Sequence, residues 1–94
     1  MNLTKLRYFV EVARCGSFSE AARRLFTAQP NISKQIAQME QELDFPLFIR
    51  DKRTIHLTAA GKFLYDNLRE VPDHLEDLFE QAAILARRES SQLS

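Results

Sequence analysis

The chain has 94 residues, of which 45% are hydrophobic, and its 13 Lys and Arg balance its 13 Asp and Glu. This length fits one small domain with a modest core, so we expect a partner chain to add to its stability. No apolar run approaches the roughly 18 residues of a membrane span, and the start lacks a secretory pattern. The single cysteine, Cys15, excludes an internal disulfide and agrees with a reducing cytoplasm.

The charges are unevenly distributed along the chain. Residues 1–58 carry nine Lys and Arg against six Asp and Glu, whereas residues 59–94 carry four against seven. The net charges of the two parts are therefore +3 and −3. A basic first part suits a polyanionic partner, and an acidic second part would be repelled by it. The zero total thus does not exclude nucleic acid.

Two helices are predicted before residue 27. The first runs over residues 3–14, with Asn2 as its N-cap and Gly16 just past its end. The second covers residues 18–26 and begins with a Ser17-x-x-Glu20 capping box, in which each side chain can satisfy one backbone donor. Both helices have apolar stripes that predict a shared core.

The third predicted helix, residues 29–43, carries the surface on which the functional prediction depends. Its buried stripe follows a helical spacing: Ile32, Ile36, Met39 and Leu43. The opposite face is polar but weakly charged, and its side chains suit base edges and phosphates. Such a face is more often simply solvated, so it indicates DNA only together with its neighbours. The short connection to the preceding helix is typical of a helix-turn-helix.

A hairpin is predicted directly after this helix. Residues 47–50 and 54–57 are β-branched and aromatic runs on either side of a charged turn. The unit is therefore a winged helix-turn-helix with its wing at residues 47–57. Arg50, Lys52 and Arg53 can reach phosphates or a narrow minor groove. A charged hairpin tip alone can equally be solvated, and the polar helix face beside it favours DNA.

A long helix is predicted from its N-cap Thr58 to about Arg88. Its apolar residues follow an unbroken heptad spacing, the seam of a coiled coil: Leu64, Leu68, Val71, Leu75, Leu78, Ala82 and Leu85. A three-helix head cannot cover this seam along its full length, so a second chain is the expected partner. Pro72 interrupts the helical hydrogen bonding, and we expect a kink or local opening there. Residues 89–94 are predicted to be a frayed tail.

In sequence order, about twenty positions closely resemble the N-terminal DNA-binding domain of LysR-type transcriptional regulators: Gly16-Ser17-Phe18, Ala21-Ala22, Leu25, Gln29-Pro30, Ser33, Ile36, Glu40, Leu43, Leu47-Phe48, Arg50, Arg53, Leu57-Thr58 and Ala60-Gly61. The resemblance covers about residues 2–88. It implies a mainly α fold, with a winged helix-turn-helix over residues 1–58 and a dimerisation linker helix over residues 59–88. It further implies a bacterial, cytoplasmic regulator whose linker helices pair antiparallel in a homodimer.

The resemblance also implies the partners and the contact residues. The dimer would read an inverted-repeat operator in double-stranded DNA, a tetramer is allowed in the full-length protein, and no cofactor is implied. A small-molecule effector would act through a C-terminal domain that this chain lacks, which makes the chain resemble a fragment. The family's base and phosphate contacts fall on seven positions: Gln29, Pro30, Asn31, Ser33, Lys34, Arg50 and Arg53.

Three departures from the family pattern lie around the third helix. Ala28 stands where a hydroxyl residue often caps this helix, and Thr27 is the expected substitute. Family members often have Arg at the position of Lys34, and an Arg guanidinium can bind a base through two hydrogen bonds at once. Asp44 and Phe45 replace a Gly-containing pair, although glycine best adopts the left-handed conformation at a helix end.

Protein docking and enzyme activity are the two functional classes that compete with DNA binding. The winged helix could dock a protein, with the acidic heptad helix as the interface, because fold alone does not determine function. An enzyme finds little support, since the sequence has no Gly-rich phosphate loop, no Cys or His pair at metal-ligand spacing and no recognisable nucleophile with its base. The sequence thus predicts no catalytic residue, no metal and no membrane partner.

Overall fold

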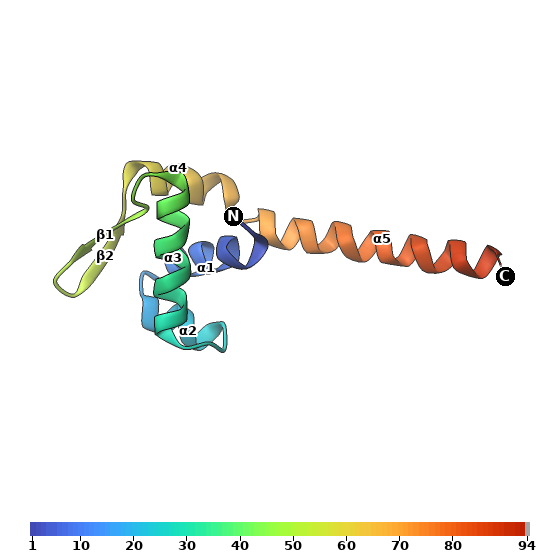
Figure 1. Cartoon of the computed structure of the whole chain (residues 1–94), viewed down its shortest axis with the longest axis horizontal. Helices are drawn as coiled ribbons and strands as arrows, with labels where there is room; N and C mark the ends of the chain where they lie inside the picture. Colours follow the sequence, from blue (N-terminus) through green and yellow to red (C-terminus); the bar gives the residue numbers. More distant parts are fainter. Residues whose placement is uncertain (94) are drawn as a thin grey trace.

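The computed structural model describes the backbone of residues 1–93 and the side chains of residues 1–91. The elements follow in the order α1 (Leu3–Cys15), α2 (Phe18–Arg24), α3 (Gln29–Leu43), β1 (Phe48–Asp51), β2 (Thr54–Leu57), α4 (Ala59–Leu68) and α5 (Val71–Leu93). Helices α1 to α4 and the hairpin form a head, and α5 projects from it as an arm (Figure 1), giving extents of 62 × 25 × 20 Å. None of the described helices has the length and apolar composition of a membrane span.

The core lies where α1, α2 and α3 meet the start of the wing. Its fully buried large side chains are Phe9, Val12, Ile32, Ile36, Met39 and Leu47. The stripe predicted for α3 is therefore confirmed, and burial of each such side chain stabilises the fold by about 1.5–3 kcal/mol. Phe48 of β1 contacts Phe9 and Phe18, each with ring centroids 5.7 Å apart. This packing leaves the polar face of α3 exposed and attaches the wing to the core.

The predicted boundaries of α1 and α2 are largely confirmed. Asn2 Oδ1 accepts a hydrogen bond from the backbone N–H of Lys5 (2.9 Å), and Gly16 ends α1 with a φ of 67°. Ser17 Oγ likewise accepts from the backbone N–H of Glu20 at 3.1 Å. The capping box is only half formed, because the Glu20 carboxylate pairs with arginines of its own helix instead of bonding back to Ser17.

The ends of α3 explain how it forms without its usual residues. Ala28 gives no side-chain cap to α3. The prediction that Thr27 would cap the helix instead is wrong, because Thr27 Oγ1 accepts a hydrogen bond from the Asn31 side chain at 3.0 Å. Pro30 has no N–H to satisfy, and the Asn31 backbone N–H donates to the Ala28 carbonyl (3.1 Å). At the other end Asp44 adopts the left-handed conformation (φ 65°), at a cost of about 1 kcal/mol, and donates to the Glu40 carbonyl.

The wing is an antiparallel hairpin with a two-residue turn, Lys52-Arg53. Phe48 pairs with Leu57, and Asp51 pairs with Thr54. The hairpin leads directly into α4, whose N-cap Thr58 accepts from the backbone N–H of Gly61 at 2.9 Å. The predicted wing and the Thr58 cap are therefore both confirmed.

The long helix predicted after the wing is divided into α4 and α5, with the break at residues 69–70. Pro72 is the second residue of α5, where its missing N–H breaks no helical bond, so the predicted local opening is confirmed. Arg7 of α1 holds this junction through Asp73 (3.2 Å), Glu76 (2.8 Å) and the Pro72 carbonyl (3.4 Å). These contacts direct α5 away from the head (Figure 1).

The two parts of the heptad seam have different surroundings. Leu64, Leu68, Val71 and Leu75 are half-buried where α4 and α5 meet α1, whereas Leu78, Ala82 and Leu85 are exposed on the arm. The helix also continues to Leu93 instead of ending near Arg88, since no Gly or Pro follows Pro72 to stop it. Of the tail predicted at residues 89–94, Ser94 lies outside the described residues.

Candidate nucleic-acid interface

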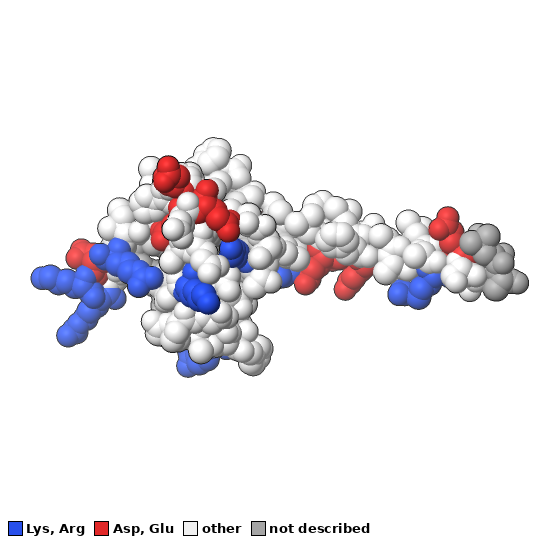
Figure 2. All heavy atoms as spheres, in the orientation of Figure 1, with Lys and Arg blue, Asp and Glu red and all other residues white. Residues whose placement is uncertain are grey.

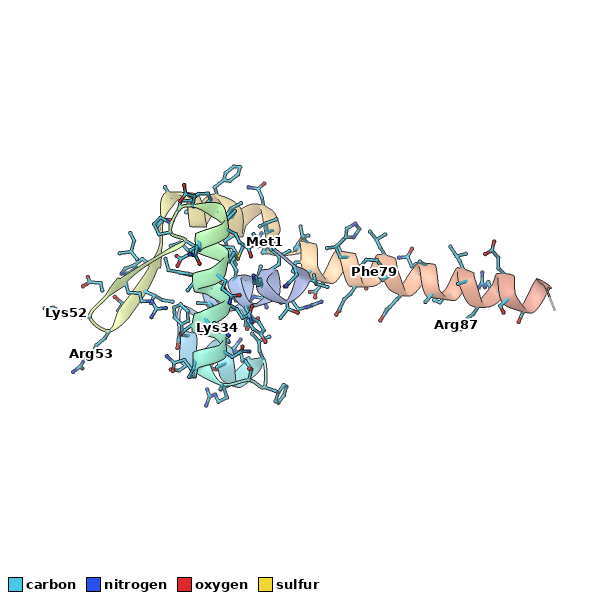
Figure 3. All side chains as sticks on the ribbon, in the orientation of Figure 1. Met1, Lys34, Lys52, Arg53, Phe79 and Arg87 are labelled. Atoms are coloured by element: carbon cyan, nitrogen blue, oxygen red, sulfur yellow. The ribbon has the colours of Figure 1, made fainter. Side chains whose placement is uncertain are left out.

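The outward face of α3 carries most of the residues predicted to contact DNA. Gln29, Pro30 and Lys34 are exposed, and Ser33 is half-buried beside them. Figure 3 shows Lys34 on the outer side of α3 and Lys52 and Arg53 at the tip of the wing. The helix and the wing therefore present their polar side chains from two neighbouring parts of the head.

Positive charges gather on the wing and on the middle of α3. Within the side chains that the structure describes, Lys34, Lys52 and Arg53 form no ion pair. Figure 2 shows blue atoms over the wing and over the middle of α3, and red atoms over the far end of α3 and along α5. Unpaired cations beside a weakly charged polar face suit a phosphate backbone.

The wing is held against α3 by a contact that the sequence analysis missed. Glu40 Oε2 accepts hydrogen bonds from the backbone N–H groups of Leu47 (2.6 Å) and Phe48 (3.3 Å). These bonds satisfy the chain where it enters β1 and fix the wing relative to α3. The only sequence signal for this contact is the carboxylate of Glu40, seven residues before the apolar Leu47 at the start of the wing.

Arg50 lies over an aromatic ring at the base of the wing. Its guanidinium is 4.2 Å from the centroid of the Phe18 ring, which itself packs edge-on against Phe48. The charge stays exposed while the stem is anchored. Arg50 therefore presents a fixed cation next to the first turn of α2.

A shallow cleft separates the wing from the starts of α2 and α3. It brings together three of the seven predicted contact residues, Gln29, Arg50 and Arg53, and is also lined by Ser17 and Ser19. Ser19 Oγ donates a hydrogen bond to Gln29 Oε1 at 2.9 Å. Part of the predicted contact set thus lies in one cleft, which is polar and open to a phosphate backbone.

Asn31 differs from the other predicted contacts. Its side chain is half-buried, and its Nδ2 donates to Tyr8 Oη (3.2 Å) and to Thr27 Oγ1 (3.0 Å). Both bonds lie within the head. Asn31 therefore stabilises the turn before α3 in this structure, and its amide nitrogen is not free for a base.

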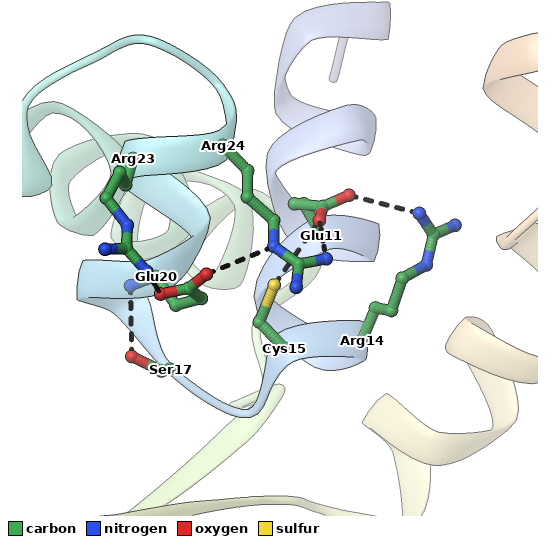
Figure 4. A network of polar contacts seen from close by, with 7 residues as sticks. All are labelled: Glu11, Arg14, Cys15, Ser17, Glu20, Arg23 and Arg24. Atoms are coloured by element: carbon green, nitrogen blue, oxygen red, sulfur yellow. Dashed lines mark hydrogen bonds and ion pairs between the residues drawn. The ribbon is translucent and has the colours of Figure 1, made fainter.

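A charged network joins α1 to α2 behind this surface (Figure 4). Arg24 reaches both Glu20 (3.3 Å) and Glu11 (3.6 Å), and Glu11 also pairs with Arg14 (3.2 Å). Hydrogen bonding from Arg24 lowers the pKa of Glu20. Burial and the bond that its thiol donates to Glu11 raise the pKa of Cys15, so the thiol stays protonated at neutral pH.

A second ion-pair group ties α1 to the far end of α3. Glu42 accepts from Lys5 Nζ (2.7 Å) and from the Met1 amino group (2.6 Å), and Lys5 is buried. The hydrogen bond from Lys5 is the main cause that lowers the pKa of Glu42 from 4.5 to about 2. A depressed folded-state pKa stabilises the head above pH 4.5, and the contribution is lost as the pH falls toward 2.

We therefore expect Glu42→Gln to narrow the acid stability range of the head. Wild type and variant should differ in free energy of unfolding at neutral pH, and the difference should shrink between pH 4.5 and about 2. Urea unfolding followed by circular dichroism over this range measures it. Glu80→Gln is the control, because Glu80 has no ion pair among the described residues of α5. A pH-independent difference for Glu42→Gln would contradict the proposed linkage.

The fold and the surface together define the class of this protein. Three helices with a helix-turn-helix spacing, a basic wing and an exposed polar face on α3 form a winged helix-turn-helix of the DNA-binding type. A family model described as the bacterial regulatory helix-turn-helix protein, lysR family, matches residues 3–62. The chain belongs to this family of transcriptional regulators, which are not enzymes, and it is a LysR-family DNA-binding domain with a linker helix.

Curated relatives share most of this chain. The Hca operon transcriptional activator HcaR of Escherichia coli (strain K12) is 51% identical over 69 residues, which is 72% of this chain and 23% of HcaR. The regulator TfdT of Cupriavidus pinatubonensis is 37% identical over 93 residues, or 99% of this chain and 41% of TfdT. The chain thus spans less than half the length of these two relatives.

The structural comparison gives the same family. The crystal structure of the BenM_DBD/catB site 1 DNA complex matches with a TM-score of 0.83 and 35% identity, covering 92% of this chain and 97% of that one. The CbnR_DBD–DNA complex matches with a TM-score of 0.82 and 32% identity, covering 92% and 99%. Both neighbours were solved bound to DNA, and each matches over the head and most of α5.

Proposed function

We propose that this chain binds double-stranded DNA sequence-specifically as a homodimer of a transcription regulator. Helix α3 would enter the major groove, and the wing would contact the backbone and the adjacent minor groove. The observation that carries the proposal is the exposed, weakly charged face of α3 flanked by a wing whose cations, Lys52 and Arg53, have no ion-pair partner within the described side chains. The BenM and CbnR domains, which share this fold, are seen in complexes with DNA.

The predicted contact residues then have separate roles. Gln29, Pro30 and Ser33 would discriminate bases, since Gln can bond a base edge and Pro can pack against a thymine methyl. Lys34 and Arg50 would hold phosphates, and Arg53 would reach a narrow minor groove. Asn31 would act indirectly, because its amide nitrogen already holds Tyr8 and Thr27.

A second copy of the chain is the partner that we propose for the exposed part of the heptad seam. Leu78 and Leu85 are 46% and 61% exposed on an arm that stands away from the head, and Phe79 beside them is 67% exposed. Pairing of two arms would cover this apolar surface. The two-fold symmetry of the dimer would match an inverted-repeat operator. Tetramer formation and effector binding would then belong to further domains of a longer, cytoplasmic protein.

The proposal predicts a characteristic salt dependence of DNA binding. A duplex enriched by selection from a random library should bind with an affinity that falls steeply with salt, because each neutralised phosphate releases counterions. Arg53→Ala should weaken binding about tenfold, and Lys34→Ala should make the slope of log K against log salt shallower by about 0.9 for each lost phosphate contact. Fluorescence anisotropy at several salt concentrations measures both quantities.

A matched variant separates this effect from a general loss of charge. Arg87→Ala removes an exposed cation from α5, far from the wing, and should leave the slope unchanged. If Arg53→Ala and Lys34→Ala both leave duplex binding and its salt slope unchanged, DNA binding by this surface is refuted. The alternative of a protein-docking winged helix, with the acidic arm as interface, would then be favoured.

A further inference from the structure

The hydrogen bond between Ser19 and Gln29 joins α2 to α3 at the edge of the outward face of α3. Ser19 lies in the first turn of α2, Gln29 is the first residue of α3, and both side chains are exposed. Ser19 Oγ donates to Gln29 Oε1 at 2.9 Å. The oxygen end of the Gln29 amide is therefore turned toward α2, and its NH2 group is directed away from Ser19.

We propose that Ser19 is a positioning residue that makes Gln29 read DNA as a hydrogen-bond donor. This inference rests on the proposed function and specifies the base chemistry of one contact. A free glutamine can accept and donate at once, which is how it pairs with the N6 and N7 atoms of adenine. Because the bond from Ser19 holds Oε1 toward α2, the two N–H donors of Nε2 are the part of the amide left to face the major groove.

The donor role selects among the four bases. Guanine presents two acceptors, N7 and O6, and thymine presents O4, whereas cytosine presents a donor, its N4 amine. Adenine offers the N7 acceptor, but a bidentate contact also needs Oε1 to face its N6 amine, and the bond from Ser19 holds Oε1 toward α2. Gln29 should therefore favour guanine or thymine at the contacted position and select against cytosine.

Ser19 could instead act by donating directly to a phosphate, and the structure separates the two roles. A serine hydroxyl has one hydrogen to donate, and here it is given to Gln29. A phosphate contact would add affinity equally on all sequences, whereas a positioning role changes the preference at one base pair. The effect of Ser19 must therefore depend on Gln29.

The test compares the base preferences of the wild type, four single variants and one double variant on libraries of random duplexes. The half-site position whose preference disappears in Gln29→Ala marks the Gln29 contact. At that position Ser19→Ala should raise the preference for adenine at least fivefold relative to guanine or thymine, because the freed Oε1 can accept from N6. Gln29→Glu should shift the preference toward cytosine, since a carboxylate only accepts. Ser19→Thr keeps the hydroxyl and should restore the wild-type preference.

Each outcome of this test decides the inference. It is supported if Ser19→Ala changes the preference in the wild-type background and has no further effect in Gln29→Ala. It is overturned if Ser19→Ala leaves the preference unchanged, if its effect persists uniformly in Gln29→Ala, or if Gln29→Ala alters no position. Failure of the wild type to enrich any duplex would overturn the proposed function itself, which distinguishes the two failures. Thermal melting of each variant checks that these exposed substitutions leave the head folded.

Discussion

Replacing Gly61 by alanine is expected to destabilise the head by about 3 kcal/mol, although glycine normally weakens a helix. Gly61 lies in the first turn of α4 and is buried against the start of the wing. A Cβ at this position would lie 2.2 Å from the Leu47 carbonyl oxygen and 3.2 Å from a Leu57 methyl. The oxygen belongs to the backbone and accepts from Thr58, so it cannot move aside cheaply.

Urea unfolding and thermal melting measure the loss, for which we expect a fall of roughly 12 °C or more in the midpoint. The position of the wing should change as well, because Leu47 and Phe48 are the residues that Glu40 holds against α3. DNA affinity of the fraction that remains folded should therefore also decrease.

The neighbouring alanine provides a matched control. Ala60 is exposed in the same turn of α4, so Ala60→Gly should cost only the helix propensity, about 1 kcal/mol. Gly61→Ala would thus lose stability through a steric clash, whereas Ala60→Gly, one position away, would lose it through helix propensity. A stabilised Gly61→Ala variant would show that α4 does not approach the backbone at Leu47.

Local sequence signals were sufficient for most of the fold. Asn2, Gly16, Ser17 and Thr58 mark helix boundaries because each acts on backbone groups within a few residues. The break at Pro72 could be predicted for the same reason, since the missing N–H is a property of that residue alone. The stripe of α3 required only the helical period, which identifies the exposed face at the same time.

The parts of the site that sequence reasoning missed depend on contacts between distant elements. Glu40 meets Leu47 only once the chain has turned after α3, and Ser19 meets Gln29 across the helix-turn-helix. The family resemblance predicts a DNA contact for Asn31, yet Tyr8 of α1 holds its amide inward. Side-chain partners of this kind follow from packing and leave no periodic signal in the chain.

The same limit applies to the linker. A continuous heptad over residues 64–85 predicted one seam, but the break at residues 69–70 allows the first part of it to pack on the head. Arg7 then fixes the base of α5 through Asp73 and Glu76. The remaining exposed seam is held at a defined position relative to the reading surface, so the spacing between two half-sites would follow from the head and its arm together.

A charged substitution on the exposed seam is expected to abolish dimer formation. In Ala82→Asp, two ionised carboxylates would enter an apolar interface, and burial of an unpaired charge costs several kcal/mol. We expect the dimer dissociation constant to rise at least about a hundredfold, equivalent to about 2.7 kcal/mol. Sedimentation equilibrium measures this change. Binding to a duplex with two half-sites should lose its cooperativity, while binding to a single half-site should persist because the head is untouched.

The adjacent alanine again supplies the control, because it points to a different face of α5. Ala83 is exposed like Ala82 but lies 100° further around α5, away from Leu78 and Leu85. It is one turn from Phe79, at the margin of the apolar surface, and faces toward Glu76 and Glu80. Ala83→Asp adds the same charge with the same helix propensity and should weaken the dimer much less than Ala82→Asp. Equal weakening by both variants would indicate a general charge effect, and no weakening by Ala82→Asp would refute the seam as the interface. The difference between two neighbouring alanines therefore tests whether the arm pairs through the face that the heptad defines.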